Sequence, residues 1–153
     1  MSSHYEFHSR WLIPTDLAIV EAIILDSKRW RVWWPDIIRV EGEPVPGYVG
    51  ARYQVTWRSV VGYTLDLAII VTGYTEGEQM TFDSSGDLDG HGTFMLSQLP
   101  SQPTEIAISW SVTTTKRWMN LFAPVLRPFF AWNHRLLMSR GEKGLRQFIA
   151  SQP

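Results

Sequence analysis

Apolar and polar residues alternate with a period of two in several segments of the chain. The segments with the clearest alternation are residues 5–13, 53–58, 63–72 and 105–112. Weaker alternation is found in residues 36–44, 78–88 and 91–99. Such a pattern is typical of strands that have one buried and one solvent-facing side. Because Pro- and Gly-containing turns separate these segments at short intervals, we predict an antiparallel meander of about seven strands.

Two short helices are predicted between the first and second strands. One runs from Asp16 to about Leu25, with Leu17, Val20 and Ile24 on one face. The other begins after Ser27 and must end before Pro35, because the residue preceding a proline is disfavoured in helical conformation.

The C-terminal segment changes to a period near 3.6, which predicts one long amphipathic helix from about Arg127 to Ile149. On a helical wheel its apolar stripe is centred on Leu137. Gly141 and Gly144 lie within the stripe, and each costs about 1 kcal/mol relative to alanine inside a helix. We expect the close approach of another backbone to explain them; a helix break at a cavity mouth is the alternative.

These elements predict an α+β fold in which one long helix covers a curved sheet, in a single domain over residues 1–153. The composition agrees, with 44% hydrophobic and 19% charged residues. The absence of cysteine excludes disulfides, cysteine-ligated metals and a cysteine nucleophile. The aromatic content is unusual, at 8 Trp, 7 Phe and 5 Tyr.

The charge and hydropathy pattern limits the classes of partner. A net charge of −1 gives no overall attraction to nucleic acid or to an anionic membrane. The longest aliphatic stretch, residues 67–71, is far shorter than the roughly 20 residues that span a bilayer, so no stable membrane insertion is expected. Since the N-terminus lacks a charged region followed by an apolar one, a cytoplasmic location is expected.

Four segments resemble the helix-grip (SRPBCC) superfamily, which includes START domains and birch-pollen-allergen proteins. They are residues 30–35, 53–65, 85–92 and 132–145. The last three are similar to its bacterial, polyketide cyclase/dehydrase-like branch. The resemblance implies a cavity between the sheet and the long helix, and an apolar ligand such as a lipid, sterol or polyketide. It carries no catalytic signature.

The candidate ligand-binding residues are the inward-facing side chains of the predicted sheet and of the long helix. They are Tyr53, Trp57, Leu67, Phe82, Phe94, Trp110, Phe130, Asn133, His134 and Leu137. The aromatic members line a cavity if a void exists and form a solid core if none does.

Polar chemistry is sparse among these candidates. Asn133 and His134 border the buried helical stripe; they either bond to backbone groups or project into the cavity, where histidine could act as an acid or base. His4 and His8 lie about 13 Å apart on a strand, too far to share one metal ion without distortion. We therefore expect no metal and no cofactor.

Three functions fit the sequence. The leading one is binding of a small apolar or aromatic molecule, which needs only a pocket. The second is a cyclase- or dehydratase-type enzyme acting on a polyketide-like substrate, which would need convergent polar groups with perturbed pKa values. The third is a protein-interaction module, which would need a large exposed apolar patch. An enzyme is the less favoured reading, because the inward-facing candidates are nearly all apolar.

Overall fold

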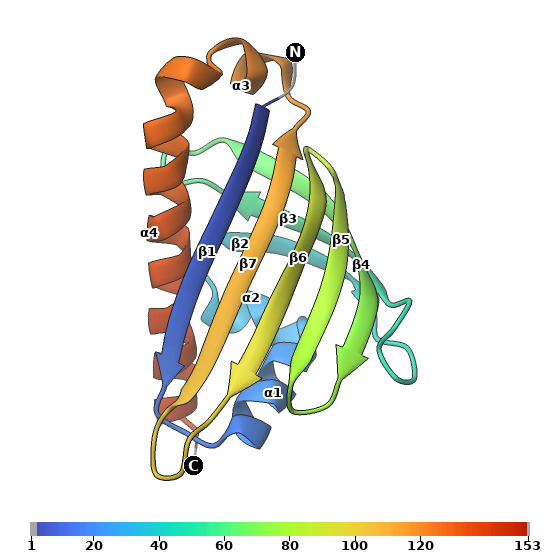
Figure 1. Cartoon of the computed structure of the whole chain (residues 1–153), viewed down its shortest axis with the longest axis vertical. Coiled ribbons are helices and arrows are strands. Elements are labelled where there is room, and N and C mark those ends of the chain that lie inside the picture. The colour runs from blue at the N-terminus through green and yellow to red at the C-terminus, as the bar shows by residue number, and fades with distance from the viewer. Residues whose placement is uncertain (1–2, 153) are drawn as a thin grey trace.

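Seven antiparallel strands form one sheet in the computed structural model, which describes residues 3–152 (Figure 1). The strands are β1 (Ser3–Ile13), β2 (Ile37–Glu43), β3 (Arg52–Arg58), β4 (Thr64–Thr75), β5 (Gln79–Gly86), β6 (Leu88–Ser97) and β7 (Thr104–Thr114). Their order across the sheet is β1-β7-β6-β5-β4-β3-β2. The predicted meander of seven strands is confirmed, and β1 joins it by pairing with β7.

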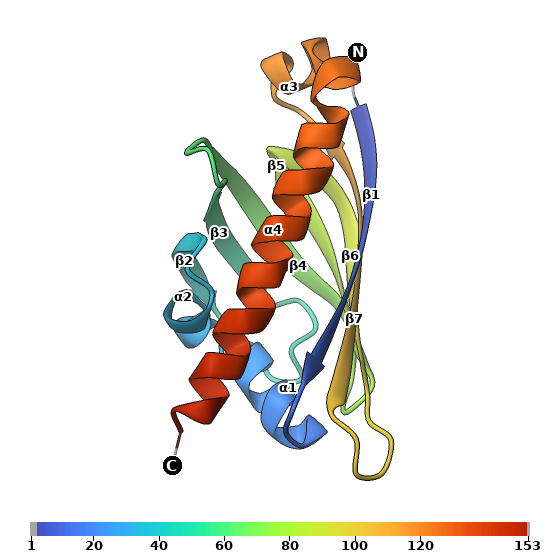
Figure 2. The ribbon, with the colours of Figure 1, turned by 90° about the vertical axis from the view of Figure 1, so that its left-hand side faces the viewer.

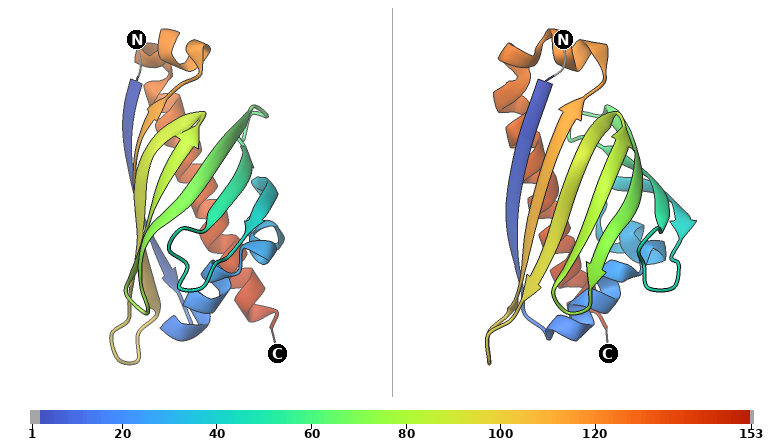
Figure 3. Two further views of the ribbon diagram at one scale, coloured as in Figure 1. Left: turned by 90° about the vertical axis from the view of Figure 1, so that its right-hand side faces the viewer. Right: turned by 45° about the vertical axis from the view of Figure 1, so that its right-hand side comes forward.

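The strand register places the alternating apolar residues on one face. Across β1 and β7, Phe7 lies opposite Trp110 and Trp11 opposite Ile106. Since neighbouring side chains on a strand point to opposite faces, this register carries a continuous apolar surface across the sheet. Figure 3 shows the sheet curving, and the helices occupy its concave side.

Five helical segments complete the fold within residues 3–152. They are α1 (Leu17–Leu25), a 3-10 turn (Ser27–Arg29), α2 (Trp30–Trp33), α3 (Arg117–Leu121) and α4 (Ala123–Ala150). Figure 2 shows α4 crossing the sheet, with α1 and α2 toward its C-terminal end and α3 beside its start. The predicted short helices and long C-terminal helix are therefore confirmed.

The start of α4 differs from the prediction. The helix begins at Ala123 rather than near Arg127, so Pro128 lies inside it. A proline within a helix removes one backbone hydrogen bond, but the carbonyl of Phe122 already accepts bonds from the amides of Val125 and Leu126 one turn earlier. These bonds establish the helix before the proline is reached. No helix within residues 3–152 is both long and apolar enough to cross a membrane.

Buried side chains between the sheet and the helices form two groups. The larger group lies toward α1 and α2 and contains Trp11, Val20, Trp33, Trp34, Tyr53, Val55, Ile106, Met138 and Leu145, among others. The smaller group lies toward α3 and contains Tyr5, Leu67, Leu88, Val112, Met119 and Phe130. The interior is thus divided along the length of α4.

Two glycines let α4 approach the segment around α2 closely. A Cβ atom at Gly144 would overlap the backbone carbonyl of Trp33, and one at Gly141 would overlap the ring of Trp34. The Gly144 contact is the backbone approach that the sequence predicts. At Gly141 the neighbour is a side chain instead.

Polar contacts reinforce the same junction. The indole Nε1 of Trp34 donates a hydrogen bond to the carbonyl of Leu137 at 3.1 Å. The carboxylate of Asp36 is buried and lies 3.1 Å from a guanidinium nitrogen of Arg140. Burial raises the pKa of Asp36, and the charge of Arg140 opposes that rise. Residues 33–36 and 137–144 together form what we call the helix clamp.

We predict that Gly144→Ala destabilises the protein. By helix propensity alone this change should stabilise α4 by about 1 kcal/mol. The overlap with the Trp33 carbonyl should outweigh that gain and lower the free energy of unfolding by about 2 kcal/mol or more. Denaturant unfolding measures the change. Ser139→Ala, on the exposed side of α4, should shift stability by less than about 0.5 kcal/mol; a Gly144→Ala protein as stable as wild type would contradict the clamp.

Candidate functional site

A cavity of about 140 Å³ lies within the larger buried group, between the sheet and α4. Its lining is predominantly aromatic and includes six of the eight tryptophans. They are Trp11, Trp30, Trp33, Trp34, Trp57 and Trp110. The unusual aromatic content of the chain is therefore concentrated around one internal space.

Elements far apart in sequence supply the walls of this cavity. β3 contributes Tyr53, Val55 and Trp57, and the loop before it contributes Tyr48. Strands β5 to β7 contribute Phe82, Phe94, Ile108 and Trp110. On the helical side, α4 contributes His134 and Met138, which are four residues apart and so lie on one face.

Six of the ten candidate residues line the cavity. They are Tyr53, Trp57, Phe82, Phe94, Trp110 and His134. The other four lie elsewhere. Leu67 and Phe130 belong to the smaller buried group near α3. Asn133 is buried, and its side-chain oxygen accepts a hydrogen bond from the amide of Val60 at 3.1 Å, so it holds the loop between β3 and β4.

The wheel prediction that Leu137 faces the cavity is wrong. Leu137 is half-buried and lies outside the lining, where its carbonyl receives the hydrogen bond of Trp34. Met138 and His134 face the cavity instead. On the wheel they lie about 100° and 60° to one side of Leu137. The predicted apolar stripe included Phe130, which packs near α3, and Gly141, which packs against Trp34. Neither residue faces the cavity, so the helix face predicted from them was rotated away from the true lining.

Several lining residues were missed by reasoning from the sequence. Trp33 and Trp34 belong to the second predicted short helix and not to the sheet, and Tyr48 falls in a loop without periodic pattern. Met138 offered one signal, since it lies one helical turn after His134. The short helices reach the cavity because they fold back over the sheet. The periodicity of the sequence shows which face of a helix is apolar, but not where the helix lies in the fold.

Three polar atoms of lining side chains are buried without a hydrogen-bond partner among the described residues. They are Nε2 of His134, Nε1 of Trp11 and Nε1 of Trp33. The indoles of Trp30 and Trp34, by contrast, donate to backbone carbonyls at 2.8 and 3.1 Å. A buried polar group without a partner costs about 1–3 kcal/mol. Surrounding side chains cover these three atoms, so the wall that faces the cavity is almost entirely apolar.

His134 is the principal titratable group of this cavity. Its ring stacks on Phe7 with centroids 3.9 Å apart and planes 15° from parallel. Burial lowers the pKa of His134 from 6.5 to about 4, because the apolar surroundings disfavour the charged imidazolium. The imidazole is therefore neutral at pH 7 and offers one donor and one acceptor nitrogen.

The charged side chains of the described residues lie outside the cavity lining. Within residues 3–152, the lining contains no Asp, Glu, Lys or Arg side chain. The described residues also include no cluster of three His, Asp or Glu side chains that could hold a metal ion. The buried carboxylate of Asp36 is directed to Arg140 in the helix clamp. The arrangement can hold a neutral, apolar molecule.

Solved structures share this architecture at low sequence identity. The protein TTHA0849 from Thermus thermophilus is 16% identical with a TM-score of 0.76, over 97% of this chain and 100% of that chain. The Bet v 1-like allergen Ara h 8.0201 is 16% identical with a TM-score of 0.66, over 98% and 100%. The chain has the helix-grip fold. No family model matches its sequence, and no curated protein matches it.

Another helix-grip neighbour is the di-domain ARO/CYC BexL of the BE-7585A biosynthetic pathway. It is 14% identical with a TM-score of 0.74, over 98% of this chain and 51% of BexL. The present chain thus corresponds to about half of that two-domain protein. The resemblance to the helix-grip superfamily that the sequence indicates is confirmed at the level of the fold.

We predict that His134 makes the helix-grip domain sensitive to moderate acid. As the pH falls from 6.5 toward 4, the unfolded chain takes up a proton at this histidine before the folded protein does, so the free energy of unfolding falls. The loss attributable to His134 is about 3 kcal/mol across this window. Unfolding of wild type and His134→Leu at several pH values measures it.

Carboxylates also titrate at low pH, but they are the same in both proteins. The difference between the free energies of unfolding of wild type and His134→Leu therefore reports the histidine alone. His91→Leu, at an exposed position on β6, is the matched control and should keep the wild-type pH dependence. An identical pH dependence for wild type and His134→Leu would show that the imidazole is not buried as described.

Proposed function

We propose that this protein binds a small, neutral, apolar or aromatic molecule in the cavity between its sheet and α4. The observation that carries the proposal is the predominantly aromatic lining, which contains one imidazole, that of His134, held neutral at pH 7. Ligand sites of this kind are mostly apolar and use a few placed polar groups to orient the ligand. The helix-grip neighbours support a ligand-binding fold in general terms.

The volume favours a ligand of about one aromatic ring. A space of about 140 Å³ is close to the roughly 150 Å³ of an engineered apolar cavity that binds benzene. Drug-sized ligands occupy pockets of about 300–1,000 Å³. A lipid- or polyketide-like ligand with several rings would therefore require the walls to move apart.

Nε2 of His134 has no hydrogen-bond partner among the described residues and is covered by its neighbours. We infer that a small movement of the wall on binding lets this nitrogen meet a ligand hydroxyl group. A hydroxyl can donate to one nitrogen of a neutral imidazole or accept from the other, so it suits either tautomer. A ligand carboxylate would lie among apolar side chains without a cation among the lining residues, and its desolvation would oppose binding. A phenol-like molecule satisfies both the apolar wall and the histidine.

Binding is a better account of the cavity than catalysis. A cyclase or dehydratase needs an acid and a base placed near one another. His134 has no charged partner in the lining, and its lowered pKa weakens it as a base. The same features favour retention of a neutral ligand.

We expect wild-type protein to bind both phenol and toluene, which have nearly the same shape and differ in one polar group. Calorimetric titration of both ligands should show a preference for phenol that His134→Leu reduces about fivefold, the value of one net hydrogen bond. Toluene binding should change little.

His91→Leu should behave as wild type with both ligands, because this residue is exposed and lies outside the lining. If neither phenol nor toluene binds the folded wild-type protein, the proposed function is wrong. If both bind but His134→Leu leaves their ratio unchanged, the role given to the histidine is wrong.

A further inference from the structure

Large apolar side chains are exposed at the end of the molecule formed by α3 and the start of α4. They are Trp118, Leu121, Phe122, Val125 and Trp132. We call this set the apolar end patch. Leu121 and Val125 are 74% and 78% exposed. In Figures 1 and 2 this end extends past the strands beside the start of β1, at the opposite end of the molecule from α1.

The patch is not part of the side of α4 that faces the cavity. Val125 and Trp132 lie seven residues apart, which places them on one helical face. That face is nearly opposite Met138 and Leu145, which are buried. Farther along α4 the corresponding outward positions are polar, as at Ser139 and Lys143. Along the described part of α4, the exposed large apolar residues are therefore confined to its first half.

The sequence segment that contains the patch is rich in cations, although the last of them, Arg140, belongs to the helix clamp. Residues 106–141 contain five Lys and Arg residues and no Asp or Glu, whereas the rest of the chain has nine against fifteen. The net charge of −1 hides this separation. The five cations are Lys116, Arg117, Arg127, Arg135 and Arg140.

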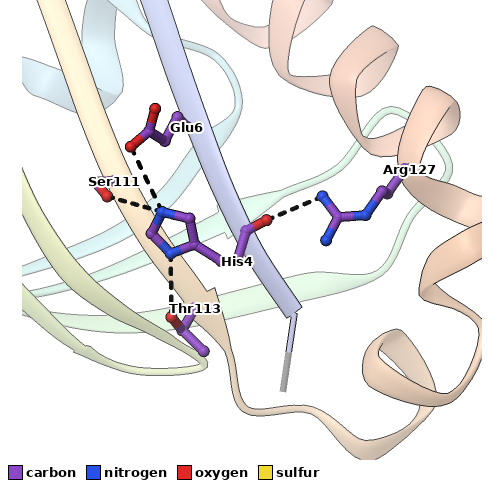
Figure 4. A network of polar contacts seen from close by, with 5 residues as sticks. All are labelled: His4, Glu6, Ser111, Thr113 and Arg127. Carbon is purple, nitrogen blue, oxygen red and sulfur yellow. Dashed lines mark hydrogen bonds and ion pairs between the residues drawn. The ribbon is translucent and has the colours of Figure 1, made fainter. Parts of the chain in front are cut away.

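Two of these cations are available to a partner. Lys116 pairs with Asp87 at 3.4 Å. Arg127 donates to the carbonyl of His4 at 3.0 Å, as Figure 4 shows, and also lies over the ring of Tyr5. The exposed residues Arg117 and Arg135 have no ion pair with any residue in the described part of the chain.

We propose that the apolar end patch is a peripheral docking surface for an anionic lipid bilayer. Interfacial helices bind membranes by burying apolar side chains at the level of the headgroups, while flanking cations contact anionic lipids. Tryptophan is favoured at this depth. The patch supplies Trp118 and Trp132 among aliphatic side chains, and Arg117 and Arg135 supply the charge. The proposal does not depend on occupancy of the cavity.

A second copy of this chain fits the surface less well. Two-fold association through the patch would bring Arg117 and Arg135 of one copy near the same residues of the other. Repulsion between these arginines opposes self-association, whereas anionic lipid headgroups would attract them.

Vesicle flotation tests the proposal. Wild-type protein should float with vesicles of equal parts phosphatidylcholine and phosphatidylserine, and much less with phosphatidylcholine alone. The double variant Leu121→Glu with Val125→Glu should lose at least about tenfold in partition coefficient. Arg117→Gln with Arg135→Gln should lose about thirtyfold on the anionic vesicles at low salt. High salt should weaken wild-type binding.

The matched control is Val32→Glu with Leu99→Glu, which changes two apolar residues of similar exposure away from this end. This control should float as wild type does. Thermal melts check that every variant is folded. Failure of wild-type protein to bind the anionic vesicles, or equal loss in the control, would overturn the proposal. Concentration-dependent self-association that the Leu121/Val125 variant abolishes, without vesicle binding, would assign the patch to a second copy instead.

Discussion

The helix clamp is the contact on which the rest of the interior depends. Trp33, Trp34 and Asp36 meet α4 through a backbone approach at Gly144, an indole-to-carbonyl hydrogen bond, and an ion pair between the buried Asp36 carboxylate and the exposed Arg140. These contacts fix both the distance and the rotation of α4 above the sheet. A well-packed interior normally leaves few voids larger than a water molecule. Here the clamp holds the helix while the sheet curves away from it, and the space between them remains open.

The two ends of the interior have different physical roles. Toward α3, buried side chains such as Leu67, Phe130 and Met119 pack together. Toward α1 and α2, the aromatic residues stand around a cavity instead of filling it. One end thus provides packing, and the other provides the cavity in which we propose that a ligand binds. A buried histidine without a partner destabilises the empty protein, and a bound hydroxyl would remove that cost.

Local periodicity was sufficient to predict most of the fold and part of the site. The period-two segments predicted the strands, and the inward aromatic residues Trp57 and Trp110 line the cavity as expected. The same reasoning failed at Leu137, because the rotation of a long helix is set by tertiary contacts such as Gly144 with Trp33. It also missed the apolar end patch, since apolar residues at helical spacing look the same in sequence whether a sheet covers them or not.

The central claim is that the space beside Met138 is an apolar void that accepts a ligand. Toluene titration and denaturant unfolding of Met138→Trp test it most directly, with Leu137→Trp as the companion variant outside the lining. We predict that Met138→Trp partly fills the void, binds toluene at least about tenfold more weakly and loses less than about 1 kcal/mol of stability. Leu137→Trp, where folded, should bind toluene as wild type does. A Met138→Trp protein destabilised by about 3 kcal/mol or more, or one that is well folded and binds toluene unchanged, would contradict the account.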